Sequence, residues 1–242
     1  MAVNINTVYQ TVLAVANKEQ RGYITPQEFN IFAENAQLEI FEQYFYDLAQ
    51  YNRVNTKAGN SYEYADIQDN IKEKISIFKA RGFSNLNNDN QGDINPTGAS
   101  VYRLGTVMVN NATEVEQVDN NELLYINKSR LTAPTESRPI YVQNFNELSQ
   151  DTRIIVYPLN VDFGQVQFEY IRKPEKPRWG FYVLGGKALH NASDSVNFEL
   201  HPSDETELIY KILKYAGIAM VREDLSRGGQ GLESMQIQQE KQ

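Results

Sequence analysis

The chain has 242 residues, a net charge of −8 at pH 7 and no cysteine. The lack of cysteine excludes a disulfide framework, a thiolate metal site and a cysteine nucleophile, and the acidity argues against a general phosphate-binding surface. Aromatic residues make up 11% of the chain, which is too many for a disordered protein. The first residues lack the basic and apolar runs of a signal peptide, and no segment approaches the roughly 20 apolar residues of a membrane span.

The beginning of the chain has the pattern of helices. A short helix is predicted after Asn6, and a long one is predicted over residues 25–51. Thr25 and Glu28 have the spacing of a capping box, in which each side chain accepts a hydrogen bond from the other residue's amide. The long helix has apolar residues on more than one face, so we expect it to act as a scaffold that packs on two sides.

A polar linker at 52–64 precedes a third predicted helix, for which Gly82 is the expected C-terminal cap. Residues 85–98 are nearly all Asn, Asp, Gly and Pro, and we expect an exposed connector there. Part of this stretch matches a calcium-binding loop, but Asn87 stands where the loop needs Asp and Gly98 where it needs a bidentate Glu. The connector is therefore favoured over a calcium site.

From residue 99 onward the apolar residues recur with the period of strands. A short helix at 120–128 is expected among them, with Leu123 and Leu124 buried. Gly185 and Gly186 lack the upstream glycine of a phosphate-binding loop, so they predict a hairpin turn. The predicted strands cover residues 101–109, 140–143, 153–157, 166–170 and 196–200.

The last predicted helix is entered at 201–204, where either Ser203 caps it or Pro202 is its first residue; the sequence leaves both open. Its apolar stripe needs a cover, and the N-terminal helices can supply it. We therefore expect an α+β fold in which N-terminal helices and a C-terminal helix pack together, with a central antiparallel β-rich region. The expected domains are a helical region 1–92 completed by a helix at 202–225, a β-rich region 93–200 and a flexible tail 226–242.

The sequence contains no recognisable catalytic or metal motif. His190 and His201 are its two histidines, and their spacing fits no zinc site. No serine lies in a nucleophile elbow, and no rule singles out two carboxylates for glycoside hydrolysis. We therefore predict no enzymatic activity, no cofactor, and no catalytic, cofactor-binding or metal-binding residues.

A basic, proline-bounded segment follows the predicted strand at 166–170, and two interpretations of it remain open. Trp179 and the lysine and arginine stems cover a sheet edge and cap the core, or the segment is a rigid docking surface with arginine and tryptophan anchors. The candidate interface residues are Arg172, Lys173, Pro174, Lys176, Pro177, Arg178 and Trp179.

Several short stretches carry a family resemblance: RGYITPQEF (21–29), AQLEIF (36–41), YRLGT (102–106), APT (133–135), YIRKP (170–174), PRWG (177–180), FELHPS (198–203) and LIYKIL (208–213). In these stretches the chain resembles the ring or neck proteins, the head-to-tail connectors, of short-tailed bacteriophages, most closely those of crAss-like phages. The resemblance spans almost the whole chain. It rests on structural signatures, and it brings no catalytic or metal residues with it.

The resemblance implies a virion protein that assembles with copies of itself. Proteins of this family couple N-terminal helices and a C-terminal helix to a β-rich region, and they usually form dodecameric rings below the portal, around the DNA channel. The expected partners are further copies of the chain, the portal protein, and neighbouring ring or tail proteins, with DNA passing through without specific binding and no membrane involved. The protein would be made in the host bacterial cytoplasm and would reside in the neck or tail of the virion.

The alternative function is a secreted or surface carbohydrate-binding β module with helical additions. The lack of a visible signal peptide and the presence of one tryptophan for sugar stacking count against it. Particle size and symmetry distinguish the two hypotheses, since a connector forms large symmetric particles and the carbohydrate-binding module is a small monomer with glycan affinity.

Overall fold

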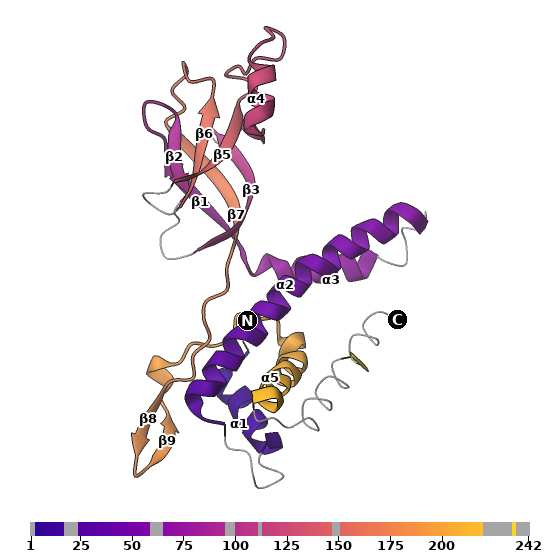
Figure 1. Ribbon diagram of the computed structural model, residues 1–242, viewed down its shortest axis with the longest axis vertical. Coiled ribbons are helices and arrows are strands. Elements are labelled where there is room, and N and C mark those ends of the chain that lie inside the picture. The colour runs from indigo at the N-terminus through magenta and orange to yellow at the C-terminus, as the bar shows by residue number, and fades with distance from the viewer. Residues whose placement is uncertain are drawn as a thin grey trace. The chain divides into compact units, whose positions relative to one another are not determined.

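The helices at the two ends of the chain belong to one structural unit, and a β-rich unit is inserted between them. In the computed structural model (Figure 1), the helical unit comprises Met1–Ile77 with Pro174–Gln242, and the β unit comprises Phe78–Lys173. The predicted α+β class is confirmed. The residues that the structure describes are 3–16, 24–58, 65–94, 100–110, 113–146, 151–219 and 234–235.

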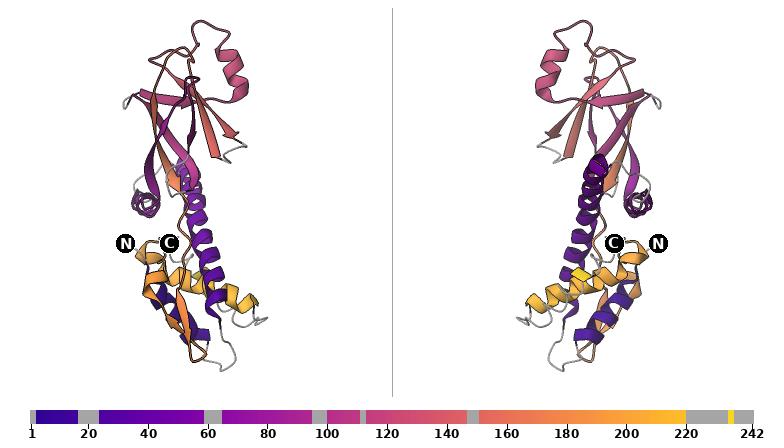
Figure 2. Two further views of the ribbon diagram at one scale, coloured as in Figure 1. Left: turned by 90° about the vertical axis from the view of Figure 1, so that its left-hand side faces the viewer. Right: turned by 90° about the vertical axis from the view of Figure 1, so that its right-hand side faces the viewer.

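In its described part, the helical unit is built on α1 (Ile5–Ala16), α2 (Pro26–Ala58), α3 (Ala65–Ser76) and α5 (Glu205–Ala219). α5 packs against both α1 and α2, and α3 packs against α2; α5 is seen crossing α2 in Figure 2. The apolar stripe of α5 is buried in this contact through Leu208, Ile212 and Ala216. The predicted packing of the N-terminal helices with the C-terminal helix is thus confirmed.

The capping box at the start of α2 forms as predicted. The Thr25 amide donates to Glu28 Oε2 at 2.9 Å, and the Glu28 amide donates to Thr25 Oγ1 at 3.3 Å. The hydrogen bonds from the backbone and side chain of Thr25 lower the pKa of Glu28, because they stabilise its carboxylate. α2 continues to Ala58, beyond the expected end at 51, since residues 52–58 contain neither Gly nor Pro to stop it.

The starts of α1 and α5 also use side-chain caps. Asn4 Oδ1 accepts hydrogen bonds from the amides of Asn6 and Thr7 at 2.9 and 3.2 Å. α5 follows a short 3-10 turn, η3 (Pro202–Asp204), in which His201 Nδ1 accepts from the Ser203 amide at 3.3 Å. Of the two open alternatives, Pro202 is therefore the first residue of the helical segment and Ser203 does not cap it.

The predicted strand at 196–200 is extended, but it belongs to the helical unit and lies outside the main sheet. Val196 pairs with Arg178, and Phe198 pairs with Val3, as isolated bridges. Phe198 is fully buried in the helical unit. The alternation in the sequence therefore reflects burial of one side of the segment, and it does not reveal whether helices or a second sheet provide the cover.

A two-stranded hairpin, β8 (Phe181–Leu184) with β9 (Lys187–His190), is the other β element of the helical unit. Gly185 and Gly186 form its turn with φ angles of +60° and +77°. Glycine adopts this left-handed conformation without a steric penalty, so the predicted hairpin turn is confirmed. A 3-10 turn, η2 (Ala192–Asp194), follows the hairpin.

A seven-stranded sheet forms the centre of the β unit within its described residues, in the order β1-β7-β3-β4-β5-β6-β2. β4 and β5 run parallel, whereas the other paired neighbours are antiparallel, so the sheet is mixed and the expectation of a purely antiparallel region is corrected. The strands are β1 (Lys79–Asn85), β2 (Gln91–Ile94), β3 (Val101–Val109), β4 (Thr113–Gln117), β5 (Ile140–Asn146), β6 (Asp151–Tyr157) and β7 (Gln165–Arg172).

The predicted strands at 101–109, 140–143, 153–157 and 166–170 correspond to β3, β5, β6 and β7. β4 was not predicted from the sequence, since its five residues carry three charged or amide side chains and a single buried valine, Val115. The short predicted helix exists as α4 (Asn120–Ile126), and Leu123 is buried in it as expected. The predicted burial of Leu124 is wrong, because this side chain is 64% exposed.

Gly82 does not end a helix. It lies in β1 opposite Phe168 of β7, and a Cβ at this position would stand 2.7 Å from the Phe168 ring. Glycine here allows an aromatic ring to pack directly on the strand backbone. A glycine after a helical pattern fits either role in the sequence, so the predicted cap is corrected to a close approach between strand and ring.

The expected connector at 85–98 is partly strand. Asn87 Oδ1 accepts the amides of Asp89 and Gln91 at 3.0 and 2.8 Å, and Asn90 has a positive φ of 54°, which together make the turn from β1 into β2. β2 then pairs with β6. Short polar strands of this kind carry no clear apolar alternation, which is why the composition suggested a loop.

The unit boundaries consequently differ from those expected at residues 92 and 200. They fall after Ile77 and after Lys173, because β1 belongs to the sheet and the residues from Pro174 to Leu200 belong to the helical unit. The two ends of the β unit are adjacent, since the Arg172 amide donates to the Phe78 carbonyl at 2.9 Å. The expected tail at 226–242 lies outside the described residues, apart from 234–235.

Candidate functional site

Trp179 lies in the core of the helical unit and is 4% exposed. Its ring is 4.2 Å from the ring of Tyr9 in α1, measured between centroids, and it stacks on His190 at 5.6 Å. Its Nε1 donates to Asn6 Oδ1 at 3.1 Å. Of the two open interpretations, the internal cap is correct for this residue, and Trp179 does not serve as an exposed anchor.

Two buried or half-buried amides of α2 hold the extended segment that contains Trp179. Asn30 accepts the Trp179 amide at 2.8 Å and donates to the Trp179 carbonyl at 3.3 Å. About two helical turns further on, Gln37 donates to the Glu175 carbonyl at 2.7 Å and accepts the Glu199 amide at 3.1 Å. The two side chains take the place of a neighbouring strand, so the segment is fixed by the helix instead of by a sheet.

The seven candidate interface residues include buried and accessible side chains and come from both units. Pro174 and Pro177 are buried, like Trp179, and this leaves the cations as the accessible members. The unit boundary divides these: Arg172 and Lys173 belong to the β unit, and Lys176 and Arg178 belong to the helical unit.

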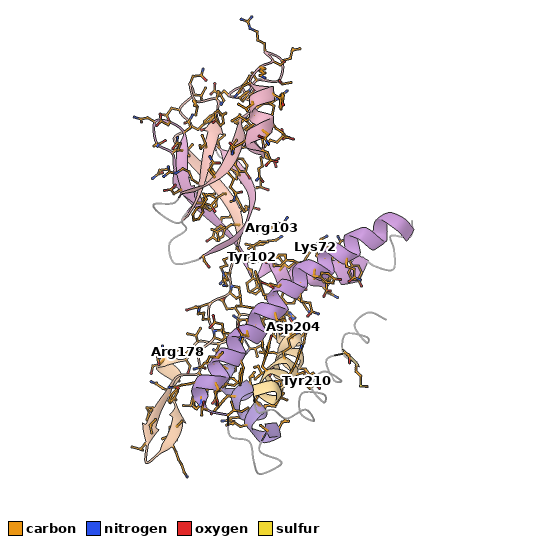
Figure 3. All side chains as sticks on the ribbon, viewed as in Figure 1. Lys72, Tyr102, Arg103, Arg178, Asp204 and Tyr210 are labelled. Carbon is orange, nitrogen blue, oxygen red and sulfur yellow. The ribbon has the colours of Figure 1, made fainter. Side chains whose placement is uncertain are left out.

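The two cations of the helical unit form surface ion pairs. Lys176 Nζ lies 2.8 Å from Glu34 Oε1, and Arg178, labelled in Figure 3, lies 2.7 Å from Asp194 Oδ2. Both cationic side chains remain more than half exposed. Exposed ion pairs contribute little to stability, so these two residues stay available to a partner, and their role in docking remains a proposal.

A buried carboxylate joins three segments of the helical unit. Asp204, at the entry to α5, is 1% exposed and accepts a short hydrogen bond from the hydroxyl of Tyr44 in α2. Lys74 of α3 lies 2.6 Å from the other carboxylate oxygen and 5.7 Å from the centre of the Tyr44 ring. The neutralised, hydrogen-bonded carboxylate satisfies the rule for buried charges, and its partners make it a structural link between helices.

A second ionic cluster joins α2 to α5. Lys211 is 1% exposed, and its Nζ lies 3.0 Å from Glu39 Oε1 and 3.5 Å from Glu207 Oε1. Tyr215 donates to the other oxygen of Glu39 at 2.7 Å. Burial raises the pKa of Glu39, but the hydrogen bonds from Tyr215 and Lys211 and the charges of Lys211 and Lys214 outweigh it, so the pKa is lowered overall.

His190 and Ser195 are close enough to suggest a catalytic pair, with Nε2 and Oγ 3.0 Å apart. Ser195 Oγ, however, donates to the Asn191 carbonyl at 2.7 Å and accepts from the Gly180 amide at 3.0 Å. Its single proton is thereby used, so His190 must donate to Oγ, whereas activation of a nucleophile requires the opposite direction. With Trp179 stacked on the imidazole, the pair fastens the base of the β8–β9 hairpin.

The partial calcium-loop match lies partly outside the described residues, which do not include 95–98. Asp93, in strand β2, is bound by Arg153, with Nε 2.7 Å from Oδ1. The hydrogen bond that Arg153 donates to Asp93 raises the pKa of the arginine. Among the described residues, no group of three or more His, Cys, Asp or Glu side chains is placed to hold a metal ion.

The surfaces that the sequence did not reveal are apolar and exposed. The β8–β9 hairpin exposes Tyr182, Val183, Leu184 and Leu189, although its strands resemble ordinary buried ones in the sequence. The signal was a run of apolar residues with no polar alternation next to a glycine turn. Such a run predicts a strand that is apolar on both faces, but it does not predict that these side chains are exposed.

Within the described part of the chain, no helix is long and apolar enough to cross a membrane. No protein-family model matches the chain, and no curated protein matches it.

Proposed function

We propose that the protein is a virion structural protein, a head-to-tail connector that forms a ring around the DNA channel and links the portal to the tail. One observation carries the proposal beyond the resemblance of short stretches. The helices from the two ends of the chain form one unit, and the β-rich unit is inserted between them. This is the arrangement of helices and β region that the resemblance implies.

Exposed apolar side chains on both units support a protein that is covered by partners. In the β unit, Tyr125 and Leu131 are exposed near α4. In the helical unit, the β8–β9 hairpin exposes its strands, as described above. A ring subunit needs two different surfaces for its two neighbours, and further surfaces for adjoining rings.

The charge of the chain suits a DNA passage. A net charge of −8 disfavours phosphate binding, so a channel formed by such subunits would let DNA slide without holding it. The alternative, a carbohydrate-binding module, is weakened by the position of Trp179, because a ring that is buried against Tyr9 cannot stack on a sugar.

Negative-stain microscopy with sedimentation velocity tests the proposal. We expect the purified protein, alone or co-expressed with the portal protein of the same phage, to form ring-shaped particles with a central hole. A protein that is monomeric when purified alone and does not bind the co-expressed portal protein would contradict the proposed connector function. Binding to a glycan array by such a monomer would favour the carbohydrate-binding module.

A further inference from the structure

The tip of the β8–β9 hairpin is apolar on both faces. Val183 and Leu184 are 66% and 67% exposed, and neighbouring residues of a strand point to opposite faces. An isolated two-stranded hairpin is marginally stable in water. At the base of this one, Phe181 stacks on Trp179 and the His190 ring forms a hydrogen bond with Ser195. The hairpin projects beyond the N-terminal end of α2 (Figure 1).

The hairpin carries a positive charge, whereas the chain as a whole is acidic. Residues 181–190 contain Lys187 and no Asp or Glu, whereas the rest of the chain has 22 Lys and Arg (23 − 1) against 31 Asp and Glu. A surface that is apolar and cationic is therefore complementary to an apolar surface with carboxylates.

The outward face of α2 is such a surface. Ile31, Leu38, Glu42 and Tyr46 are spaced seven, four and four residues apart, so they lie along one side of the helix. Ile31 and Tyr46 are exposed large apolar residues, and Glu42 is exposed with no ion pair among the described side chains. Residues 26–51 carry no Lys or Arg at all.

The hairpin does not cover this face in its own subunit. Its base is fixed beside Asn30, at the beginning of α2, and Glu42 lies about 18 Å further along the helix at 1.5 Å per residue. The hairpin points past the N-terminal end of the helix, as the left view of Figure 2 shows. The two complementary surfaces of one copy therefore remain available to other copies.

We propose that the β8–β9 hairpin of one copy packs on the outward face of α2 in a second copy, with Lys187 facing Glu42. The two surfaces differ, so the contact is head-to-tail, and repetition closes into a ring or extends into a filament. This inference rests on the proposed function, because it identifies the contact by which the ring would form. The partner of the hairpin is therefore a second copy of this chain, and the portal and other rings would bind to other surfaces.

Cysteine cross-linking tests the contact directly, since the chain has no native cysteine. Lys187→Cys and Glu42→Cys are purified separately, mixed, and treated with a short bis-maleimide cross-linker. We expect a covalent dimer in the mixture, none with either variant alone, and a ladder of larger species with the double variant. A mixture of Lys187→Cys with Lys72→Cys, an exposed position on α3, is the matched control and should give no dimer.

Sedimentation velocity measures the strength of the same contact without a covalent cross-linker. Leu184→Asp should raise the dissociation constant between copies about tenfold or more, as expected when one apolar side chain loses its cover. The control Leu159→Asp, which alters an apolar side chain that is 50% exposed in the β unit, should leave it unchanged. The paired reversal Lys187→Glu with Glu42→Lys should associate more tightly than either single reversal.

The outcomes separate this inference from the proposed function. If the parent forms rings but Lys187→Cys and Glu42→Cys do not cross-link, the hairpin contact is wrong and the connector stands. Cross-linking of Lys187→Cys with itself would indicate paired hairpins and also overturn the head-to-tail contact. If Leu184→Asp forms normal rings but no longer binds the portal, the occupant is the portal and the inference fails.

Discussion

At the scale of single residues, the helical unit depends on polar side chains buried among apolar ones. Asn30 and Gln37 each serve two backbone groups of the opposite segments, and Lys211 is enclosed between carboxylates. Removing one member of such a set leaves a buried polar group without its partner, which costs more than the loss of an exposed ion pair. The contribution of a polar residue to the stability of the helical unit therefore depends on how deeply its side chain is buried.

Trp179 and Arg178 illustrate this difference side by side. We expect Trp179→Ala to destabilise the helical unit by about 3 to 5 kcal/mol, because it leaves a cavity beside Tyr9 and His190. Arg178→Ala removes an ion pair whose arginine is 60% exposed, and it should change stability by less than about 1 kcal/mol. Urea unfolding followed by circular dichroism measures both. Equal, small effects would contradict the internal position of Trp179.

The acid sensitivity of the helical unit should depend on Glu39. Its pKa is lowered in the folded protein, so it stabilises the fold above its unfolded pKa, and that contribution is lost as the pH falls through the folded value. Tyr215→Phe removes one hydrogen bond to this carboxylate and should cost about 1 kcal/mol near neutral pH. The difference between parent and variant should shrink in acid, where Glu39 is protonated in both.

Tyr210→Phe is the control for this experiment, because Tyr210 lies on the same helix (Figure 3) and is half-buried. Its stability difference from the parent should not vary with pH. If the Tyr215→Phe difference is also constant down to about pH 3, Glu39 does not account for the acid sensitivity.

At the scale of elements, apolar period and capping residues were sufficient to predict most helices and strands. The long helix, its Thr25 cap, the strands at 101–109 and 166–170 and the Gly185 turn all depend on local pairs or short periods. The roles of Gly82 and of the 196–200 segment depend on what packs against them, and that cover comes from residues far along the chain. The burial of Trp179 depends on distant residues in the same way, since α1 and α2 provide its cover; the docking role of the exposed cations stays a proposal.

The contact of α5 with the N-terminal helices can be tested at its centre. Ile212→Asp places a charge where the parent side chain is fully buried, and we expect a loss of several kcal/mol in the stability of the helical unit. Thr206→Asp introduces the same charged side chain at an exposed position in the first turn of the same helix, where an acidic residue is favourable. Thermal unfolding of the control should match the parent, and a parent-like Ile212→Asp would refute the packing.

The close approach at Gly82 gives the β unit a comparable test. Gly82→Ala adds a methyl group 2.7 Å from the edge of the Phe168 ring. This overpacking should destabilise the sheet by about 1 to 3 kcal/mol. Lys79→Ala, exposed on the same strand, is the control and should have little effect. An unchanged Gly82→Ala protein would mean that the ring has room to move.

At the scale of the whole molecule, the β unit is one continuous segment inserted into the sequence of the helical unit, and its buried apolar clusters consist of its own residues. We expect residues 78–173 to fold alone, because β1 and β7 pair along their length and close the fragment at its ends. Circular dichroism of the fragment should show a cooperative transition matching one of two transitions of the full chain. A fragment without cooperative unfolding would show that the β unit needs the helical unit.

The hydrogen bond between Arg172 and Phe78 also has a consequence for the helical unit. Seen from that unit, the inserted residues 78–173 are a loop of 96 residues (173 − 78 + 1). When the insert is folded, the ends of this loop are held together; when it is unfolded, closing the loop costs about 4 kcal/mol of chain entropy. Folding of the insert therefore favours folding of its host through chain connectivity, even if no side chain of one touches the other.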